Sequence, residues 1–195
     1  MRWTVGRVRI TNVVEIAATG GTRFILPQAT PEESRKIGWL APHYANAEGR
    51  LRLNVQSWIV ETPQRRIIVD TCIGNGKANR SVPTWNGLDT PFLSDLAAAG
   101  YPPDSIDTVL CTHLHVDHVG WNTTLAGGEW VPTFTKARYV FGKDEYDHWA
   151  AHSPAGEHRA VFEDSVRPIV ARGLADLVAS DHRLCEEVSL ISTPG

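Results

Sequence analysis

Four residues able to bind a metal ion fall within six positions, in the stretch His113-Leu114-His115-Val116-Asp117-His118. The chain has eight histidines in 195 residues, and three of them lie in this short stretch. Neutral imidazole and carboxylate groups are ligands that a borderline divalent metal such as zinc accepts. Because this density of ligands is improbable by chance, we predict a metal site here rather than a solvated histidine-rich turn.

An apolar run, Thr108-Val109-Leu110-Cys111, directly precedes the motif and predicts a strand that delivers the ligands. Side chains alternate along a strand, so a strand ending in a turn would place His113 and His115 on one side. Asp117 and His118 would then come from the turn and approach from a different direction. That arrangement suits two metal ions better than one.

The segment Thr112–Gly120 resembles the metal-binding signature of the metallo-β-lactamase superfamily, which comprises hydrolases with an αββα sandwich and usually a two-metal centre. The resemblance also takes in Ile67–Thr71 and Ser192–Gly195, and it covers most of residues 50–195. It implies an α+β fold of the αββα type, and the sequence around the motif is similar to the lactonase and organophosphate-hydrolase branch. The implied activity is that of a metal-dependent hydrolase.

By this resemblance, His113 and His115 bind the first metal, and Asp117 and His118 bind the second. The implied cofactors are two divalent metal ions, with zinc expected first and iron or manganese as alternatives. Bound metal lowers the pKa of water from about 15.7 to about 7, which makes hydroxide available at neutral pH. Asp117 is also the expected catalytic residue, orienting the hydroxide or carrying a proton, although it could instead be a turn-capping carboxylate.

Asp70 follows an apolar run, where the family commonly has an Asp-Thr-Gly segment whose acid supports the metal site. Metal-binding histidines usually donate their other N–H to a carboxylate or carbonyl, which fixes the tautomer. Asp70 could equally be an aspartate of a turn at the end of a strand. Cys72 stands where the family commonly has glycine, so the local turn is expected to differ.

Three aromatic residues, Phe24, Trp85 and Trp121, are candidates for the walls of a substrate pocket, because apolar walls are typical of small-molecule sites. The alternative is that they are core residues, since the chain has seven tryptophans. Five further histidines lack metal-like neighbours in the sequence and are interpreted as surface or hydrogen-bonded residues: His43, His148, His152, His158 and His182.

The elements that must position this site alternate between strands and helices after a strand-rich first third. Periodicity, proline and glycine place their boundaries. We expect strands over 5–16, 51–61, 65–70, 106–111, 137–141 and 188–191, a loop over 75–89, and helices beginning at Thr30-Pro31 and over 92–99, 143–151 and 160–172.

Length and composition indicate a single domain over residues 1–195 in a soluble protein. The net charge is −3 and there is no long basic run, so a nucleic-acid partner is not expected. No apolar segment has the length of a signal peptide core or of a membrane span. Three widely spaced cysteines fit a reducing compartment, so we expect a cytoplasmic protein that acts on a small-molecule substrate.

The family pattern continues after a Thr-Pro-Gly segment with a further histidine, a bridging aspartate and a final histidine, whereas this sequence ends at Gly195. We therefore expect the amino-terminal half to two-thirds of a sandwich that is incomplete at its carboxyl end. Such a piece would bind metal weakly and would pair with a complementing carboxyl-terminal segment or form a homo-oligomer through its uncovered sheet.

Four functions follow from these features. The first is hydrolysis of a small ester, lactone or related acyl or phosphoryl bond. The second is thioester hydrolysis of the hydroxyacylglutathione type, which shares the same ligand string. The third is a non-catalytic, incomplete sandwich that acts as a complementing or binding module. The fourth is oxidoreductase chemistry with iron in the same ligand set.

Overall fold

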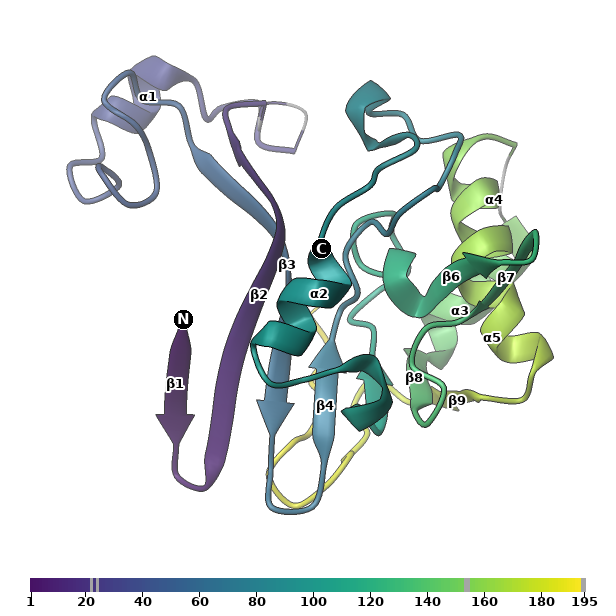
Figure 1. Cartoon of the computed structure of the whole chain (residues 1–195). Coiled ribbons are helices and arrows are strands. Elements are labelled where there is room, and N and C mark those ends of the chain that lie inside the picture. The colour runs from purple at the N-terminus through teal and green to yellow at the C-terminus, as the bar shows by residue number, and fades with distance from the viewer. Residues whose placement is uncertain (22, 24, 153–154, 194–195) are drawn as a thin grey trace. The chain divides into compact units, whose positions relative to one another are not determined.

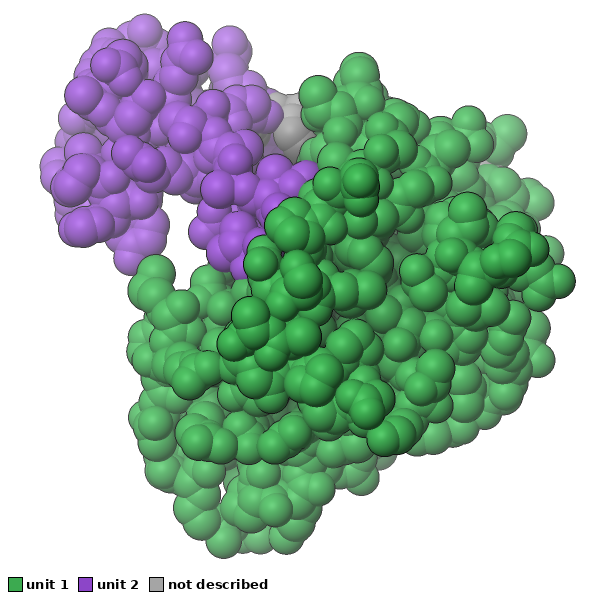
Figure 2. Space-filling model, viewed as in Figure 1, with its two compact units in different colours: residues 1–13, 56–195 green, residues 14–55 purple. Residues whose placement is uncertain are grey.

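The computed structural model of the chain describes residues 1–21, 23, 25–152 and 155–193. These residues form two compact units, one of residues 1–13 and 56–195 and the other of residues 14–55 (Figure 2). The metal motif lies in the larger unit. The expectation of a single domain stays a prediction.

A seven-stranded mixed sheet forms the framework, with the strand order β1-β2-β3-β4-β5-β8-β9 (Figure 1). The first strands pair as antiparallel hairpins, β1 with β2 and β3 with β4, whereas β4, β5, β8 and β9 run parallel. In chain order the strands of this sheet are β1 (Arg2–Val5), β2 (Val8–Thr19), β3 (Arg52–Glu61), β4 (Arg66–Val69), β5 (Thr108–Leu110), β8 (Arg138–Gly142) and β9 (Ala175–Val178).

Both faces of the parallel strands β4, β5 and β8 are largely buried, as is usual where a parallel sheet is covered on two sides. On one face, a row of cross-strand neighbours is fully buried: Ile59, Ile68, Val109 and Tyr139. On the other face, a core cluster of Ile67, Leu110 and Val140 is packed against half-buried apolar residues that include Val188 and Leu190. The sheet is therefore rigid where its strands end at the metal motif.

Helices of the larger unit lie mainly beside β8 and β9, where α3 contacts both strands (Figure 1). A second, two-stranded sheet of β6 and β7 closes around Gly127-Gly128, whose φ angles of +60° and +87° suit a tight hairpin turn. The remaining elements are η2 (Pro83–Trp85), α2 (Phe92–Ala98), η3 (Pro103–Ser105), η4 (Gly120–Asn122), β6 (Thr123–Ala126), β7 (Glu129–Pro132), α3 (Lys143–His152), α4 (Glu157–Val161), η5 (Phe162–Val166) and α5 (Arg167–Ala171).

A buried ion cluster fastens the loop that follows β4. Asp164 accepts two hydrogen bonds from Arg80, at 2.9 and 3.1 Å, and lies 3.7 Å from the ammonium of Lys77. Lys77 also donates to Thr123 at 2.6 Å, and its ammonium lies 3.6 Å from the ring centre of Trp130. Burial lowers the pKa of Lys77 to about 7, an effect that the charge of Asp164 opposes. Two cations thus share one carboxylate in the interior.

The smaller unit includes the short helix α1 (Pro31–Arg35), which follows β2 and precedes β3 in the chain. Thr30 caps it as expected, because its side chain accepts a hydrogen bond from the amide of Glu33 at 3.3 Å. Gly49 has a φ of +80°, and a Cβ there would lie 2.2 Å from the carbonyl oxygen of Pro31, so the turn next to α1 requires glycine.

The structure confirms most of the expected elements and corrects others. The predicted helix over 160–172 is three segments, α4, the π-helical turn η5 and α5, and the π turn leaves Pro168 in a first turn, where its missing N–H is not needed. The predicted strand over 188–191 is wrong: among the described residues, Ser189 forms only an isolated antiparallel bridge with Arg183, and the carbonyl of Val188 accepts from Leu184 and Cys185. Val188 and Leu190 are half-buried against the sheet, whereas Ile191 is exposed. β6, β7 and β9 had not been expected.

Among the described residues, no helix has the length and apolar character that crossing a bilayer requires.

Candidate metal centre

The histidine motif occupies the loop that leaves β5, at the edge where the parallel strands end. β5 ends at Leu110, and residues 111–118 are bends and turns, so the expectation that His113 and His115 share one side of a strand is wrong. Asp70 directly follows β4 and Lys143 directly follows β8. Carboxyl ends of neighbouring parallel strands meet at one edge of a sheet, and ligands commonly bind there.

Three imidazole rings of the motif gather in this loop. The ring centre of His113 lies 3.9 Å from that of His118 and 4.6 Å from that of His115. The Nε2 atom of His118 lies 3.4 Å from a carboxylate oxygen of Asp117. Burial, reinforced by the two neighbouring rings, lowers the pKa of His113 and favours its neutral, metal-binding form. The motif therefore brings together the donor types that a divalent metal takes.

The donors are close to one another but have not converged around a common point. Among the residues that the structure describes, no three His, Cys, Asp or Glu side chains form a finished metal cage. Instead His118 lies between two carboxylates, Asp117 and Asp70. Burial acts against the charged imidazolium, but these two hydrogen-bonded partners raise the pKa of His118 to about 9. The donor chemistry fits a metal, and ligand binding by His118 requires loss of this proton.

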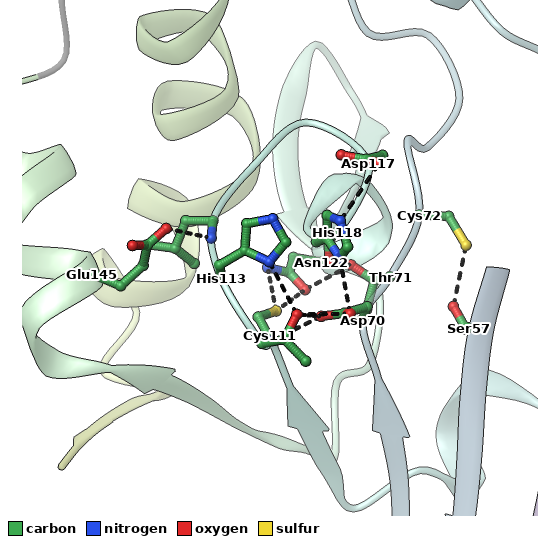
Figure 3. Close-up of polar contacts among 12 residues, drawn as sticks. Ser57, Asp70, Thr71, Cys72, Cys111, His113, Asp117, His118, Asn122 and Glu145 are labelled. Atoms are coloured by element: carbon green, nitrogen blue, oxygen red, sulfur yellow. Dashed lines mark hydrogen bonds and ion pairs between the residues drawn. The ribbon is translucent and has the colours of Figure 1, made fainter. Parts of the chain in front are cut away.

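Asp70 lies behind the histidines and contacts two parts of the motif (Figure 3). One of its oxygens accepts a hydrogen bond from the amide N–H of Thr112 at 2.8 Å, and the other accepts one from the Nδ1–H of His118 at 2.9 Å. The Thr112 hydroxyl, which bonds to the same carboxylate, lies 3.1 Å from Nδ1 of His113. If that hydroxyl donates to Asp70 and accepts from His113, His113 keeps Nε2 for a metal, and His118 can offer its Nε2 once the proton shared with Asp117 is lost.

The backbone at Asp70 and Cys72 is left-handed, with φ angles of +57° and +53°. Few residues other than glycine adopt this conformation, so Cys72 takes the shape for which the family commonly uses glycine. Its thiol is buried and lies 3.2 Å from the hydroxyl of Ser57 (Figure 3).

Backbone hydrogen bonds fasten the end of the motif to the turn after β4. The amide of Thr71 donates to the carbonyl of His118 at 2.7 Å, and the amide of Gly120 donates to the carbonyl of Cys72 at 2.8 Å. A Cβ at Gly120 would lie 1.8 Å from the carbonyl oxygen of Ile73, so only glycine permits this approach. The turn that carries Asp70 and the turn that carries the metal motif are therefore held together.

Sequence reasoning did not find Glu145, which lies in the first turn of α3. Its carboxylate accepts a hydrogen bond from the amide of Leu114, inside the metal motif, at 2.9 Å (Figure 3). Nor did it place His158 near the motif, yet the His158 ring lies 5.8 Å from that of His115 and stacks on Trp149 at 4.3 Å. Both contacts bring together segments that are far apart in the sequence. Only the parallel pairing of β5 with β8 could have suggested the contact between Glu145 and Leu114.

A cavity of about 870 Å³ opens beside the motif, with His113 and His115 in its lining. The two described aromatic residues that were expected to line a pocket, Trp85 and Trp121, are not in its lining. Trp121 is 3% exposed and stacks on Phe92 with ring centres 5.7 Å apart, so it is a core residue. Trp85 is half-buried in η2 and does not line the cavity, and Phe24 lies outside the described residues.

Comparison with known proteins agrees with this architecture. Residues 50–189 match the Metallo-beta-lactamase superfamily. The chain is 24% identical over 194 residues to N-acyl homoserine lactonase AiiB of Agrobacterium fabrum (strain C58 / ATCC 33970), covering 92% of this chain and 60% of that protein. The match to the superfamily extends over more than half of the chain, which therefore belongs to the metallo-beta-lactamase superfamily.

Solved structures show the same fold. A probable metal-dependent hydrolase from Staphylococcus aureus superposes with a TM-score of 0.69 at 21% identity, over 94% of this chain and 63% of that one. AidC, a dizinc quorum-quenching lactonase, superposes with a TM-score of 0.65 at 17% identity, over 94% of this chain and 62% of that one. This chain thus spans somewhat less than two-thirds of the length of these relatives.

Proposed function

We propose that this chain carries the metal site of a metal-dependent hydrolase that opens lactones or related esters of small molecules. The observation that carries the proposal is the group of imidazoles at positions 113, 115 and 118, with Asp70 bonded to His118 at 2.9 Å. Membership of the superfamily and the similarity to a named N-acyl homoserine lactonase support the substrate class.

His113 and His115 would hold one divalent ion, and Asp117 and His118 would hold a second, with zinc the first candidate. When bound, such ions supply Lewis acidity toward a substrate carbonyl and make water acidic enough to attack at neutral pH. Asp70 accepts the Nδ1–H of His118, which fixes the tautomer and directs Nε2 away from β4.

Lactone opening needs one proton to be moved. An oxygen of water bonds to the carbonyl carbon, the ring C–O bond breaks, and a proton passes from the water to the departing alkoxide. Asp117 is the proposed carrier of this proton. Burial acts to raise its pKa, but the hydrogen bond and charge of His118, a backbone hydrogen bond and the charge of His113 together hold the pKa of Asp117 below its ordinary value. The carboxylate is thus ionised and able to accept the proton.

The cavity beside the motif supports a small substrate. Its volume of about 870 Å³ lies within the usual range for small-molecule pockets, roughly 300 to 1,000 Å³. Leu190 and Ile191 give it an apolar side, while Thr112 and Lys143 give it polar groups. An acyl chain could lie against the apolar side with the ester group at the histidines.

The test is turnover of four substrates by the purified protein, together with its bound metal by elemental analysis. We expect N-hexanoyl homoserine lactone to be hydrolysed faster than S-lactoylglutathione, p-nitrophenyl acetate or diethyl 4-nitrophenyl phosphate. Preference for the thioester would replace this proposal with the hydroxyacylglutathione type of activity. Metal binding without turnover of any of the four would favour a non-catalytic module.

His115→Ala should remove stable binding at the first site and lower turnover by orders of magnitude. His43→Ala is the matched control, because this exposed histidine lies in the smaller unit, outside the motif. If His115→Ala retains its metal and its turnover, the assigned role of this residue is refuted.

A further inference from the structure

One oxygen of Glu145 joins helix α3 to the metal motif. Its Oε1 atom accepts the amide N–H of Leu114 at 2.9 Å and the indole N–H of Trp149 at 2.8 Å. Leu114 stands between His113 and His115 in the sequence, and its own side chain is buried. The backbone amide that Glu145 accepts from therefore lies between the two histidines expected to bind the first metal.

The indole end of this connection reaches the side of His115. Trp149 lies one helical turn after Glu145 in α3, and its ring centre is 5.6 Å from that of His115. The same indole stacks on His158, with ring centres 4.3 Å apart and planes inclined by 18°. Glu145 therefore determines the position of the backbone on one side of His115 and of an aromatic wall on the other.

A carboxylate in the first turn of a helix ordinarily stabilises the exposed amides of that helix. The carboxylate of Glu145 instead accepts hydrogen bonds from an amide of the loop after β5 and from the indole of Trp149, one turn along the helix. α3 has no fully buried residue among those described, and other acids, such as Asp144, are available in its first turn. The position of Glu145 is therefore better explained by what it holds in the motif.

We propose that Glu145 is a positioning residue for the metal site, which keeps His113 and His115 in place before a metal binds. This inference rests on the proposed function only in taking these two histidines as ligands. Preorganised ligands bind metal more tightly because less order has to be imposed at the moment of binding. Loss of the partners that orient metal ligands typically weakens metal binding about 10- to 100-fold.

Two readouts test the proposal, Co²⁺ titration followed by visible absorption and amide hydrogen exchange at Leu114 in the metal-free protein. We expect Glu145→Ala to weaken binding of the first Co²⁺ by about 10- to 100-fold and to speed exchange at Leu114. Glu145→Gln keeps a carbonyl acceptor and should stay close to the native protein in both. Asp147→Ala is the control, because it removes an exposed carboxylate of the same helix that pairs with Lys143.

Native Co²⁺ affinity and spectrum in Glu145→Ala, or unchanged protection of Leu114, would overturn the proposal. If the native protein itself bound no Co²⁺, the proposed function would fail, while exchange at Leu114 would still test whether Glu145 holds the motif. Should Glu145→Ala not fold, Trp149→Phe removes one of the two hydrogen bonds, and Co²⁺ binding as tight as in the native protein would then count against the proposal.

Discussion

Replacement of Asp70 by asparagine tests how the histidines are oriented. The carboxylate accepts bonds from the Thr112 amide at 2.8 Å and from Nδ1–H of His118 at 2.9 Å. Asparagine keeps one carbonyl oxygen for Thr112, but its amide group then presents N–H donors to Nδ1 of His118. The imidazole must move its proton to Nε2, the atom that we expect to bind metal.

The expected cost follows from the bond that is lost. A hydrogen bond to a charged group contributes about 1.5–3 kcal/mol, and loss of a partner that orients a ligand weakens metal binding about 10- to 100-fold. These figures agree, because each factor of ten corresponds to about 1.4 kcal/mol. We therefore predict that Asp70→Asn binds Zn²⁺ about 10- to 100-fold more weakly in a competition titration against a chromophoric chelator.

Asp176→Asn is the matched control, since it removes a half-exposed carboxylate of β9 that pairs with Arg138. It should leave Zn²⁺ affinity unchanged. Asp70→Asn with an affinity within about twofold of the native protein, under conditions where the control is normal, would refute the orienting role.

Three further predictions concern the framework. Asp164→Asn leaves Lys77 and Arg80 buried without their carboxylate and should lower the free energy of unfolding, measured in urea, by about 3–5 kcal/mol. An unchanged urea midpoint would show that this ion cluster contributes nothing to stability. Burial lowers the pKa of Lys77 to about 7 from an ordinary value of 10.5, so the folded protein loses this proton first. The raised pKa of His118, about 9, acts in the opposite direction, so the contribution of Lys77 is measured as the free energy of unfolding of the native protein minus that of Lys77→Met. This difference should rise between about pH 7 and 10 and be flat below, and an equal pH slope in the two proteins would contradict this. Gly120→Ala would place a Cβ 1.8 Å from the carbonyl oxygen of Ile73 and should lower the free energy of unfolding, measured by thermal unfolding, by about 3 kcal/mol or more. As a control, the Cβ of Gly38→Ala meets no atom within 4 Å, so this variant should change the free energy of unfolding only mildly.

The metal motif could be predicted because its candidate ligands are contiguous in the sequence. Nothing more than composition and spacing was needed to single out the stretch from His113 to His118. Their geometry was not predictable in the same way: the strand ends at Leu110, and the turn that follows is set by backbone bonds to Thr71 and Cys72. Those bonds join segments more than 40 positions apart.

Elements with strong local signals were also predictable. The cap at Thr30 and the hairpin of β3 and β4 follow from nearby residues alone, and the structure confirms both. The strand β9 and the irregular segment 182–190 were not predictable in this way. Both are short and apolar, and which of them pairs as a strand depends on which one reaches the edge of β8. In such short segments, a buried loop and a paired strand have the same apolar sequence pattern.

The contact of Glu145 with Leu114 spans 31 positions and joins a helix to a loop. In the sequence this residue resembles any acid at the start of a helix, and no local pattern separates it from Asp144. Contacts of this kind become visible only when β5 and β8 are known to be parallel neighbours.

The most direct test of the central claim is a crystal structure of the protein grown with excess Zn²⁺, with anomalous diffraction recorded at the zinc edge. We predict one anomalous peak in contact with His113 and His115 and a second in contact with Asp117 and His118. The absence of any peak at the motif under these metal-replete conditions, with the imidazoles turned apart, would contradict it.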